Sequence, residues 1–159
     1  MSKLRFLSIL VVLTALSVSV SGCRSFQSGV LQIYSDKQDR VIGEYEISAG
    51  DSFRLEYIHS SEKTPIHDYF LIDAEGRIIL TEERFDWYAV GLECHPFYDK
   101  SNIVFDDGVT RVFLNREFDV FPIRVGWIAQ QVVVIAGENI KLKNIAEPGD
   151  LLKLSVVRK

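Results

Sequence analysis

The segment Gly50-Asp51-Ser52-Phe53-Arg54-Leu55-Glu56-Tyr57-Ile58-His59 determines the fold class of this chain. Phe53, Leu55 and Tyr57 alternate with charged residues, which is the period-two pattern of a β-strand that buries one face. The preceding Ala49-Gly50-Asp51 triplet is typical of a turn. We therefore expect a half-buried strand here, entered from a tight turn.

Similar apolar segments recur along the rest of the chain and are separated by turns rich in Gly, Asp and Pro. Val, Ile, Phe and Tyr dominate these segments, and such residues favour strands. No segment keeps a helical period long enough to predict a helix. We predict an all-β fold, a compact antiparallel β-sandwich or barrel of about 9–11 short strands. The expected strands are 29–35, 40–47, 52–59, 66–72, 77–82, 110–114, 118–125, 131–136, 140–145 and 151–157, with 85–108 as a long loop-like connection.

The N-terminus has the three zones of an export signal. Lys3 and Arg5 precede an apolar run over 6–20, which is shorter than a membrane-spanning helix requires. Val20-Ser21-Gly22-Cys23 then resembles the cleavage site of bacterial lipoproteins. We expect residues 1–22 to be a signal-peptide helix, Cys23 to be the lipidated residue, 23–28 to be a short tether and 29–159 to form one β domain.

Charge and cysteine content limit the possible partners. The full chain has a formal net charge of −4, and the signal peptide carries two of its positive charges, so the mature chain is acidic at −6. An acidic domain argues against nucleic acid as a partner, and acyl chains on Cys23 would supply the membrane attachment. Without Cys23, Cys94 has no intramolecular disulfide partner, and we expect it to be buried and unreactive.

The densest polar cluster follows the Gly50–His59 segment and comprises His59, Ser60, Lys63, Thr64 and Pro65. These side chains could bind an anionic ligand, with Lys63 facing a carboxylate or phosphate. They could equally form a structured hairpin loop in which Ser, Thr and His bond to nearby backbone groups, and we favour this interpretation. Strand alternation places His59 on the buried face, so we expect its imidazole to be partly enclosed.

A second candidate surface is aromatic and lies in the long connection. Trp87, Tyr88 and Gly91 could present a partner-binding patch, or the aromatic rings could close one end of the core. No catalytic, metal-binding or cofactor-binding pattern is evident. The spacing of His59, His67, Cys94 and His95 does not match known zinc sites, and a Cys94-dependent enzyme remains the weakest hypothesis.

The stretch from Gly50 to Ile66, with its Tyr-Ile-His-Ser-x-x-Lys-Thr-Pro segment, resembles the family of domains of unknown function called DUF1850. Ile79–Phe85 and Gly91-Leu92 share in the resemblance, although Ala89 stands where the family carries a glycine. The resemblance implies a small, exported, often lipid-linked domain. It also implies an accessory role near tripartite transporters of the TRAP type, especially those that use a TAXI-class solute-binding protein.

Two functional hypotheses follow for the mature domain. The first is an extracytoplasmic interaction module of the cell envelope that serves a TRAP-type transporter. The second is a small-ligand domain that binds an anionic solute through the His59–Pro65 loop. Arg24, rather than Asp, follows the lipidated cysteine, which favours the outer over the inner membrane if the host is Gram-negative.

We predict that Cys23→Ser abolishes membrane attachment, because this sulfur is the only acyl acceptor in the predicted cleavage motif. The measurement is incorporation of a fatty-acid probe, together with membrane fractionation. The Cys94→Ser variant serves as the control and should label normally, whereas undiminished labelling of Cys23→Ser would contradict the lipoprotein assignment.

Overall fold

The computed structural model describes residues 26–60, 63–86 and 102–159, which contain eleven β-strands and one four-residue helix. All strand pairs are antiparallel. The elements are β1 (Ser28–Ser35), β2 (Arg40–Ser48), β3 (Ser52–Ile58), β4 (Pro65–Ile72), β5 (Ile78–Asp86), β6 (Ile103–Asp106), β7 (Val109–Phe118), β8 (Val120–Arg124), β9 (Val132–Ile135), β10 (Glu138–Lys141), α1 (Leu142–Ile145) and β11 (Leu151–Arg158).

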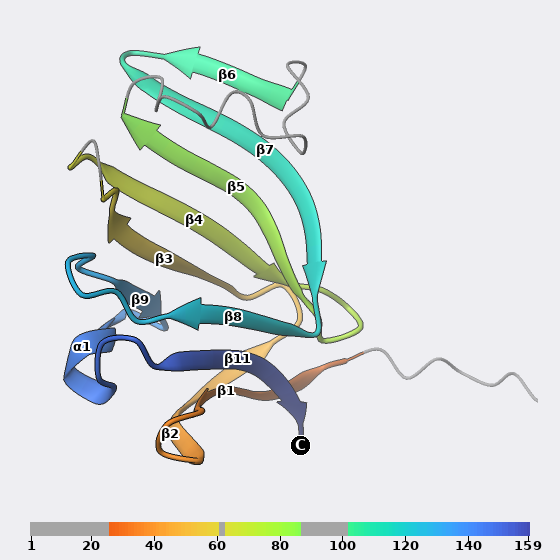
Figure 1. Cartoon of the computed structure of the whole chain (residues 1–159). Coiled ribbons are helices and arrows are strands. Elements are labelled where there is room, and N and C mark those ends of the chain that lie inside the picture. Colours follow the sequence, from red (N-terminus) through yellow and green to blue (C-terminus); the bar gives the residue numbers. More distant parts are fainter. Residues whose placement is uncertain (1–25, 61–62, 87–101) are drawn as a thin grey trace, which may run out of the picture.

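The strands form two sheets that pack as a sandwich, which confirms the predicted all-β class and excludes a closed barrel (Figure 1). The small sheet has the order β2-β1-β11-β8, and the large sheet has the order β10-β9-β3-β4-β5-β7-β6. We call the face of each sheet that is turned toward the other its inner face. Because four strands cannot cover seven, part of the inner face of the large sheet extends beyond the small one.

Strand β3 has the expected alternation, with Phe53 and Leu55 buried and Tyr57 half-buried. Phe53 stacks on Phe70 of β4, with ring centroids 4.7 Å apart and planes only 8° from parallel. Phe70 in turn contacts Phe121 of β8 at 4.7 Å, which joins the large sheet to the small one. These aromatic contacts lie within a core of fully buried side chains, which also contains Leu31, Ile33, Ile72, Ile78, Val133, Leu152 and Leu154.

A second, smaller apolar cluster lies on the large sheet and comprises Ile66, Phe85 and Val112, with Ile103 and Leu114 packed against it. It belongs to β4, β5, β6 and β7, the strands toward the β6 edge of the large sheet. The inner face of the large sheet therefore carries two apolar regions, one shared with the small sheet and one nearer the β6 edge.

Three predicted boundaries are wrong. Strand β5 continues to Asp86 because a bulge between Leu80 and Glu82 keeps Phe85 on the buried side. Strand β6 lies within the segment predicted to be loop-like, where it pairs with β7. The predicted 118–125 strand is two strands, since the chain bends at Asp119 and passes from the large sheet into the small one.

The predicted 140–145 strand is also wrong over most of its length, because Leu142–Ile145 is helical. Ile140 and Leu142 are both buried, so the apolar alternation persists across the change of structure. The backbone N–H of Ala146 donates to the Leu142 carbonyl and closes one helical turn. A single turn is too short for a helical period to appear in the sequence.

The N-terminal end of β1 is fixed to the domain by Phe26, which is 3% exposed. Its backbone N–H donates to the Ala74 carbonyl in the turn between β4 and β5. Its ring lies where side chains on Gly29 and Gly76 would be, since a Cβ added at either position would come within 2.9–3.0 Å of it. Only Arg24 and Ser25 separate this buried residue from Cys23.

A buried polar cluster joins the β1–β2 turn to the start of β11. Ser35 and Asp150 are both 0% exposed. The Ser35 hydroxyl donates to Asp150 Oδ2 at 2.5 Å, and the Lys37 backbone N–H donates to Asp150 Oδ1 at 3.0 Å. Ser35 Oγ also accepts from the Gln38 backbone N–H at 3.1 Å, so one carboxylate organises the whole turn.

We predict that Asp150→Ala lowers the free energy of unfolding by about 2–4 kcal/mol, because two donors near or within the core lose a charged acceptor. The nearby Glu147→Ala is the matched control. The Glu147 side chain is 85% exposed, and its ion pair with Lys37 spans 3.9 Å, so it should change stability by less than about 0.5 kcal/mol. Chemical denaturation measures both variants, and equal effects would contradict the role given to Asp150.

Candidate functional site

The sandwich has two ends, which we name from the course of β1. At one end, β1 begins and Gly29 pairs with Arg158 near the C-terminus. We call it the tether end, because the sequence predicts a tether just before β1. At the far end, Ser35 pairs with Leu152 and Leu151 pairs with Arg124, the last residue of β8. The loop between β8 and β9 therefore lies at the far end (Figure 1). The β3–β4 loop is close to it, because Glu56 near the end of β3 pairs with Val132 at the start of β9.

The described residues of the His59–Pro65 loop form a turn closed by its own backbone. The His59 N–H donates to the Thr64 carbonyl at 2.8 Å, and the Lys63 N–H donates to the His59 carbonyl at 3.1 Å. The Lys63 ammonium donates to the Ser60 carbonyl within the same loop. Ser60 and Lys63 are exposed, His59 and Thr64 are half-buried, and Pro65 begins β4. This is the geometry of a structured turn in which the cation already has an acceptor.

The other candidate residues from the sequence, Cys23, Trp87, Tyr88, Gly91 and Cys94, lie outside the described residues. Among residues 26–60, 63–86 and 102–159, no three His, Cys, Asp or Glu side chains are grouped closely enough to hold a metal ion. Over the same part of the chain, no helix has the length and apolar character needed to cross a bilayer.

The β8–β9 loop presents two large apolar side chains to solvent. Trp127 is 82% exposed and Ile128 is 69% exposed. Gln131 braces the loop from within, since its Oε1 accepts from the Gly126 N–H at 2.8 Å and its Nε2 donates to the Arg124 carbonyl at 3.1 Å. We call Trp127 and Ile128 the apolar tip. The sequence interpretation missed it, because a Gly-Trp-Ile triplet between two strands does not by itself show whether the Trp is exposed or buried.

The outer face of the large sheet carries ion pairs. Glu82 is 9% exposed and accepts from Arg84 Nε at 2.7 Å and from Arg111 Nε at 2.6 Å. Burial raises the pKa of Glu82, but the hydrogen bonds from the two guanidinium groups outweigh it, so the pKa lies below its ordinary value. On β3, which β4 separates from β5, Arg54 donates to Glu56 at 2.6 Å. These charges are therefore neutralised within the face.

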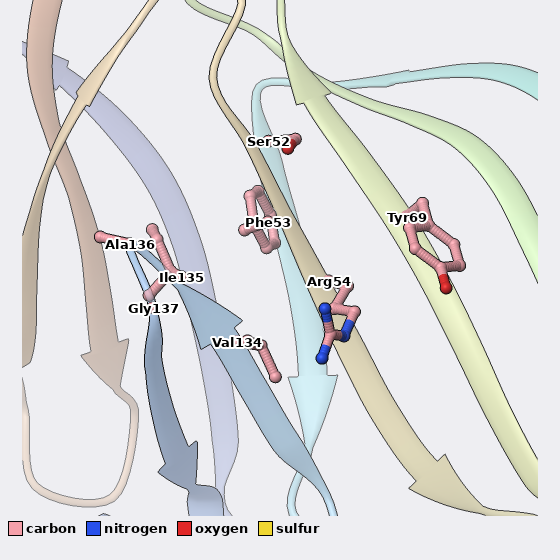
Figure 2. Close-up of a pocket in the computed structure, with 8 residues that line it drawn as sticks. All are labelled: Ser52, Phe53, Arg54, Tyr69, Val134, Ile135, Ala136 and Gly137. Atoms are coloured by element: carbon pink, nitrogen blue, oxygen red, sulfur yellow. The ribbon is translucent and has the colours of Figure 1, made fainter.

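A shallow depression of about 280 Å³ lies on this face, beside β9 (Figure 2). Figure 2 shows Arg54 of β3 and Tyr69 of β4 on neighbouring strands, with Val134 of β9 on the other side of β3. The Tyr69 ring already receives the guanidinium of Arg84, whose Cζ lies 4.3 Å from the ring centroid. Arg54 and Tyr69 are engaged by Glu56 and Arg84, which lie outside the lining, so this depression offers little to a charged ligand.

A different arrangement occurs on the inner face, where strand register aligns Leu55, Asp68, Glu83 and Val112 in one row across β3, β4, β5 and β7. Asp68 is only 6% exposed, and its Oδ1 has no hydrogen-bond partner. It lines a shallow cleft of about 230 Å³ beside β8 that is open to solvent, which we call the β8 cleft. The cleft is bounded by Leu55, Tyr57, Asp68, Phe121, Pro122, Ile123, Arg124 and Gln131.

Burial and the facing carboxylate of Glu83 raise the pKa of Asp68 from its ordinary value of 3.8 to about 8. The charge of Arg116 and a hydrogen bond from the Tyr57 hydroxyl act in the opposite direction but do not overcome burial. Asp68 is therefore largely a neutral carboxylic acid at pH 7. The alternation of Ile66, Asp68 and Phe70 was the sequence signal that could have placed this carboxyl group on the buried face.

Together, the described residues form a β-sandwich with an apolar tip at one end and a buried acid in a cleft. Residues 53–142 match the model of the family described as Domain of unknown function (DUF1850). The match covers more than half of the 159 residues, so the chain belongs to this family. Its range includes the apolar tip and the β8 cleft. No curated protein and no solved structure matches the chain.

We predict that Asp68→Asn raises stability increasingly as the pH rises from 4 to 8. Over this window the wild-type side chain is ionised when unfolded but protonated when folded, so unfolding releases a proton and stability falls with pH. Each tenfold difference in proton affinity is worth about 1.4 kcal/mol, and we expect a gain on the order of 3–5 kcal/mol at pH 8 and almost none at pH 4.

Urea denaturation across this pH range provides the measurement. The exposed turn variant Asp107→Asn is the control, and its effect should be small at every pH. A difference between Asp68→Asn and wild type that does not change with pH would show that Asp68 is not protonated in the folded domain.

Proposed function

We propose that this chain is a lipid-anchored, extracytoplasmic interaction module that serves a TRAP-type solute transporter of the TAXI class. Its partner would be a transporter subunit or the solute-binding protein. The single observation that carries the module assignment is the apolar tip, which stands at the opposite end of the small sheet from the tether. The choice of transporter is supported by the resemblance of the family alone.

The apolar tip has the physical character of a binding hot spot. Trp is enriched among the residues that dominate binding energy, and burying a side chain of this size is worth roughly 2–3 kcal/mol. The loop is already braced by Gln131, so little conformational freedom would be lost on association. Water-exposed Trp127 and Ile128 on an ordered loop are therefore best explained by a partner that covers them.

The position of the tip favours a protein partner over the bilayer. Strand β1 has eight residues, and a strand rises about 3.3 Å per residue, so the tip lies on the order of 25 Å from the tether end. With Cys23 only three residues before the buried Phe26, the tether end would rest at the membrane surface. The tip would then point away from the lipid, where a protein partner could contact it.

The alternative of an anionic solute at the His59–Pro65 loop draws less support from the geometry. The Lys63 ammonium, the cation expected to receive such a solute, donates to the Ser60 carbonyl instead. Two backbone donors of the described loop, the N–H groups of His59 and Lys63, are also bonded to carbonyls of the same loop. The Thr64 hydroxyl is buried without a hydrogen-bond partner, so it does not face an incoming solute.

We predict that Trp127→Ser combined with Ile128→Ser lowers capture of the partner at least tenfold when the lipoprotein is isolated from its native membrane after crosslinking. The melting temperature should barely change, because both side chains are exposed. Val157→Ser is the matched control, since Val157 is an exposed aliphatic residue of β11 at the tether end, and it should leave capture unchanged.

Identification of the captured proteins separates the two parts of the proposal. Transporter subunits or a solute-binding protein, lost with the tip variant, would support both parts. A different protein lost with the tip variant would overturn the transporter assignment. Equal capture by the tip variant and wild type would overturn the role of the tip.

A further inference from the structure

We infer that the β8 cleft is a binding site for a small cationic amine with an apolar body, whose ammonium group bonds Asp68 Oδ1. The site lies between β8 of the small sheet and strands β3 and β4 of the large sheet. It is separate from both the apolar tip and the His59–Pro65 loop, and it does not depend on the proposed interaction module.

The first support is an unsatisfied acceptor on Asp68, one of the side chains that line the cleft. Asp68 is more than nine-tenths buried, and its Oδ1 is without a hydrogen-bond partner. An unpaired buried acceptor costs roughly 1–3 kcal/mol, so folded proteins rarely retain one without a reason. A ligand that brings a donor to this atom would recover that free energy.

The second support is the size and lining of the cleft. A volume of about 230 Å³ exceeds the roughly 30 Å³ that one water occupies in the liquid, so the cleft can hold an organic molecule of several non-hydrogen atoms. Leu55, Phe121 and Ile123 provide apolar walls. The ligand therefore needs an apolar body as well as a donor.

The other polar side chains of the cleft are committed elsewhere. Arg124 Nη1 donates to the Gly149 carbonyl at 3.0 Å. Gln131 uses its Oε1 and Nε2 to brace the β8–β9 loop. The Tyr57 hydroxyl bonds the Asp68 carboxyl group itself. Recognition of a ligand would consequently centre on Asp68.

The third support is charge. Asp68 faces the Tyr57 hydroxyl from β3, the Glu83 carboxylate from β5 and the Arg116 guanidinium from β7, while Arg124 of β8 lines the cleft mouth. The charge of Arg116 does not suffice to ionise Asp68, which keeps a proton. An ammonium group would displace that proton, giving a carboxylate–ammonium pair and one proton released to solvent. An anionic ligand would find no counter-charge at Asp68.

The experiment titrates the mature full-length chain with benzylammonium, benzyl alcohol and benzoate by isothermal calorimetry. We expect benzylammonium to bind and the alcohol to bind at least tenfold more weakly, with no binding of benzoate. Between pH 6 and 7 the affinity should rise about tenfold, because the binding form of Asp68 is the ionised one, and the rise should level off above pH 8. Buffers of different ionisation enthalpy should report close to one proton released per amine bound at pH 6.

Asp68→Asn should remove benzylammonium binding, whereas Asp107→Asn in the exposed β6–β7 turn should not. The Trp127→Ser, Ile128→Ser variant should bind the amine normally, which keeps this site distinct from the apolar tip. Equal binding of the alcohol and the ammonium, binding without proton release, an unaffected Asp68→Asn variant, or no saturable binding by wild type would each overturn the inference.

Discussion

The contact of Phe70 with Phe53 in its own sheet and with Phe121 in the opposite sheet fixes how the two layers meet. It links sheets of unequal width, four strands against seven. The four strands cannot cover all seven, and the smaller apolar cluster toward β6 stays separate from the core that the two sheets share. The row that contains Asp68 and Glu83 falls near this boundary, where the interior is dry enough to raise a carboxyl pKa yet open enough to form a cleft.

Most of the fold was predictable because period-two alternation persists wherever one strand face is buried. The Phe53–Leu55 segment and the final strand show it clearly, and both were placed correctly. The errors occurred where the apolar alternation of the sequence continues but the backbone no longer forms one continuous strand. Leu142 continues the apolar pattern, but it lies in a helical turn. At Asp119 the chain passes from the large sheet to the small one within a run that is otherwise apolar. Such changes depend on contacts between distant strands, which no local pattern encodes.

The candidate sites were less predictable than the fold. Local chemistry predicts that Ser60, Lys63 and Thr64 form a structured turn through bonds to nearby backbone. In the structure the Lys63 ammonium makes such a bond, whereas the buried Thr64 hydroxyl has no partner. Parity alone could place Asp68 on the inner face, but its unpaired oxygen depends on which strands the small sheet leaves uncovered. Likewise, nothing in the Gly126–Ile128 sequence distinguishes an aromatic residue that closes a core from one that a braced loop holds in water.

The burial of Phe26 has a mechanical consequence. Its ring and its backbone bond to Ala74 attach the chain to the domain immediately before β1, a strand paired on both sides, with β2 and with β11. Tension on the preceding residues, such as a lipid anchor at Cys23 would transmit, pulls along β1. The hydrogen bonds of an antiparallel pair run perpendicular to the strands, so this force loads many of them in shear at once rather than opening them one by one. A chain held at this point would therefore pull the domain in a direction that its antiparallel ladder resists well.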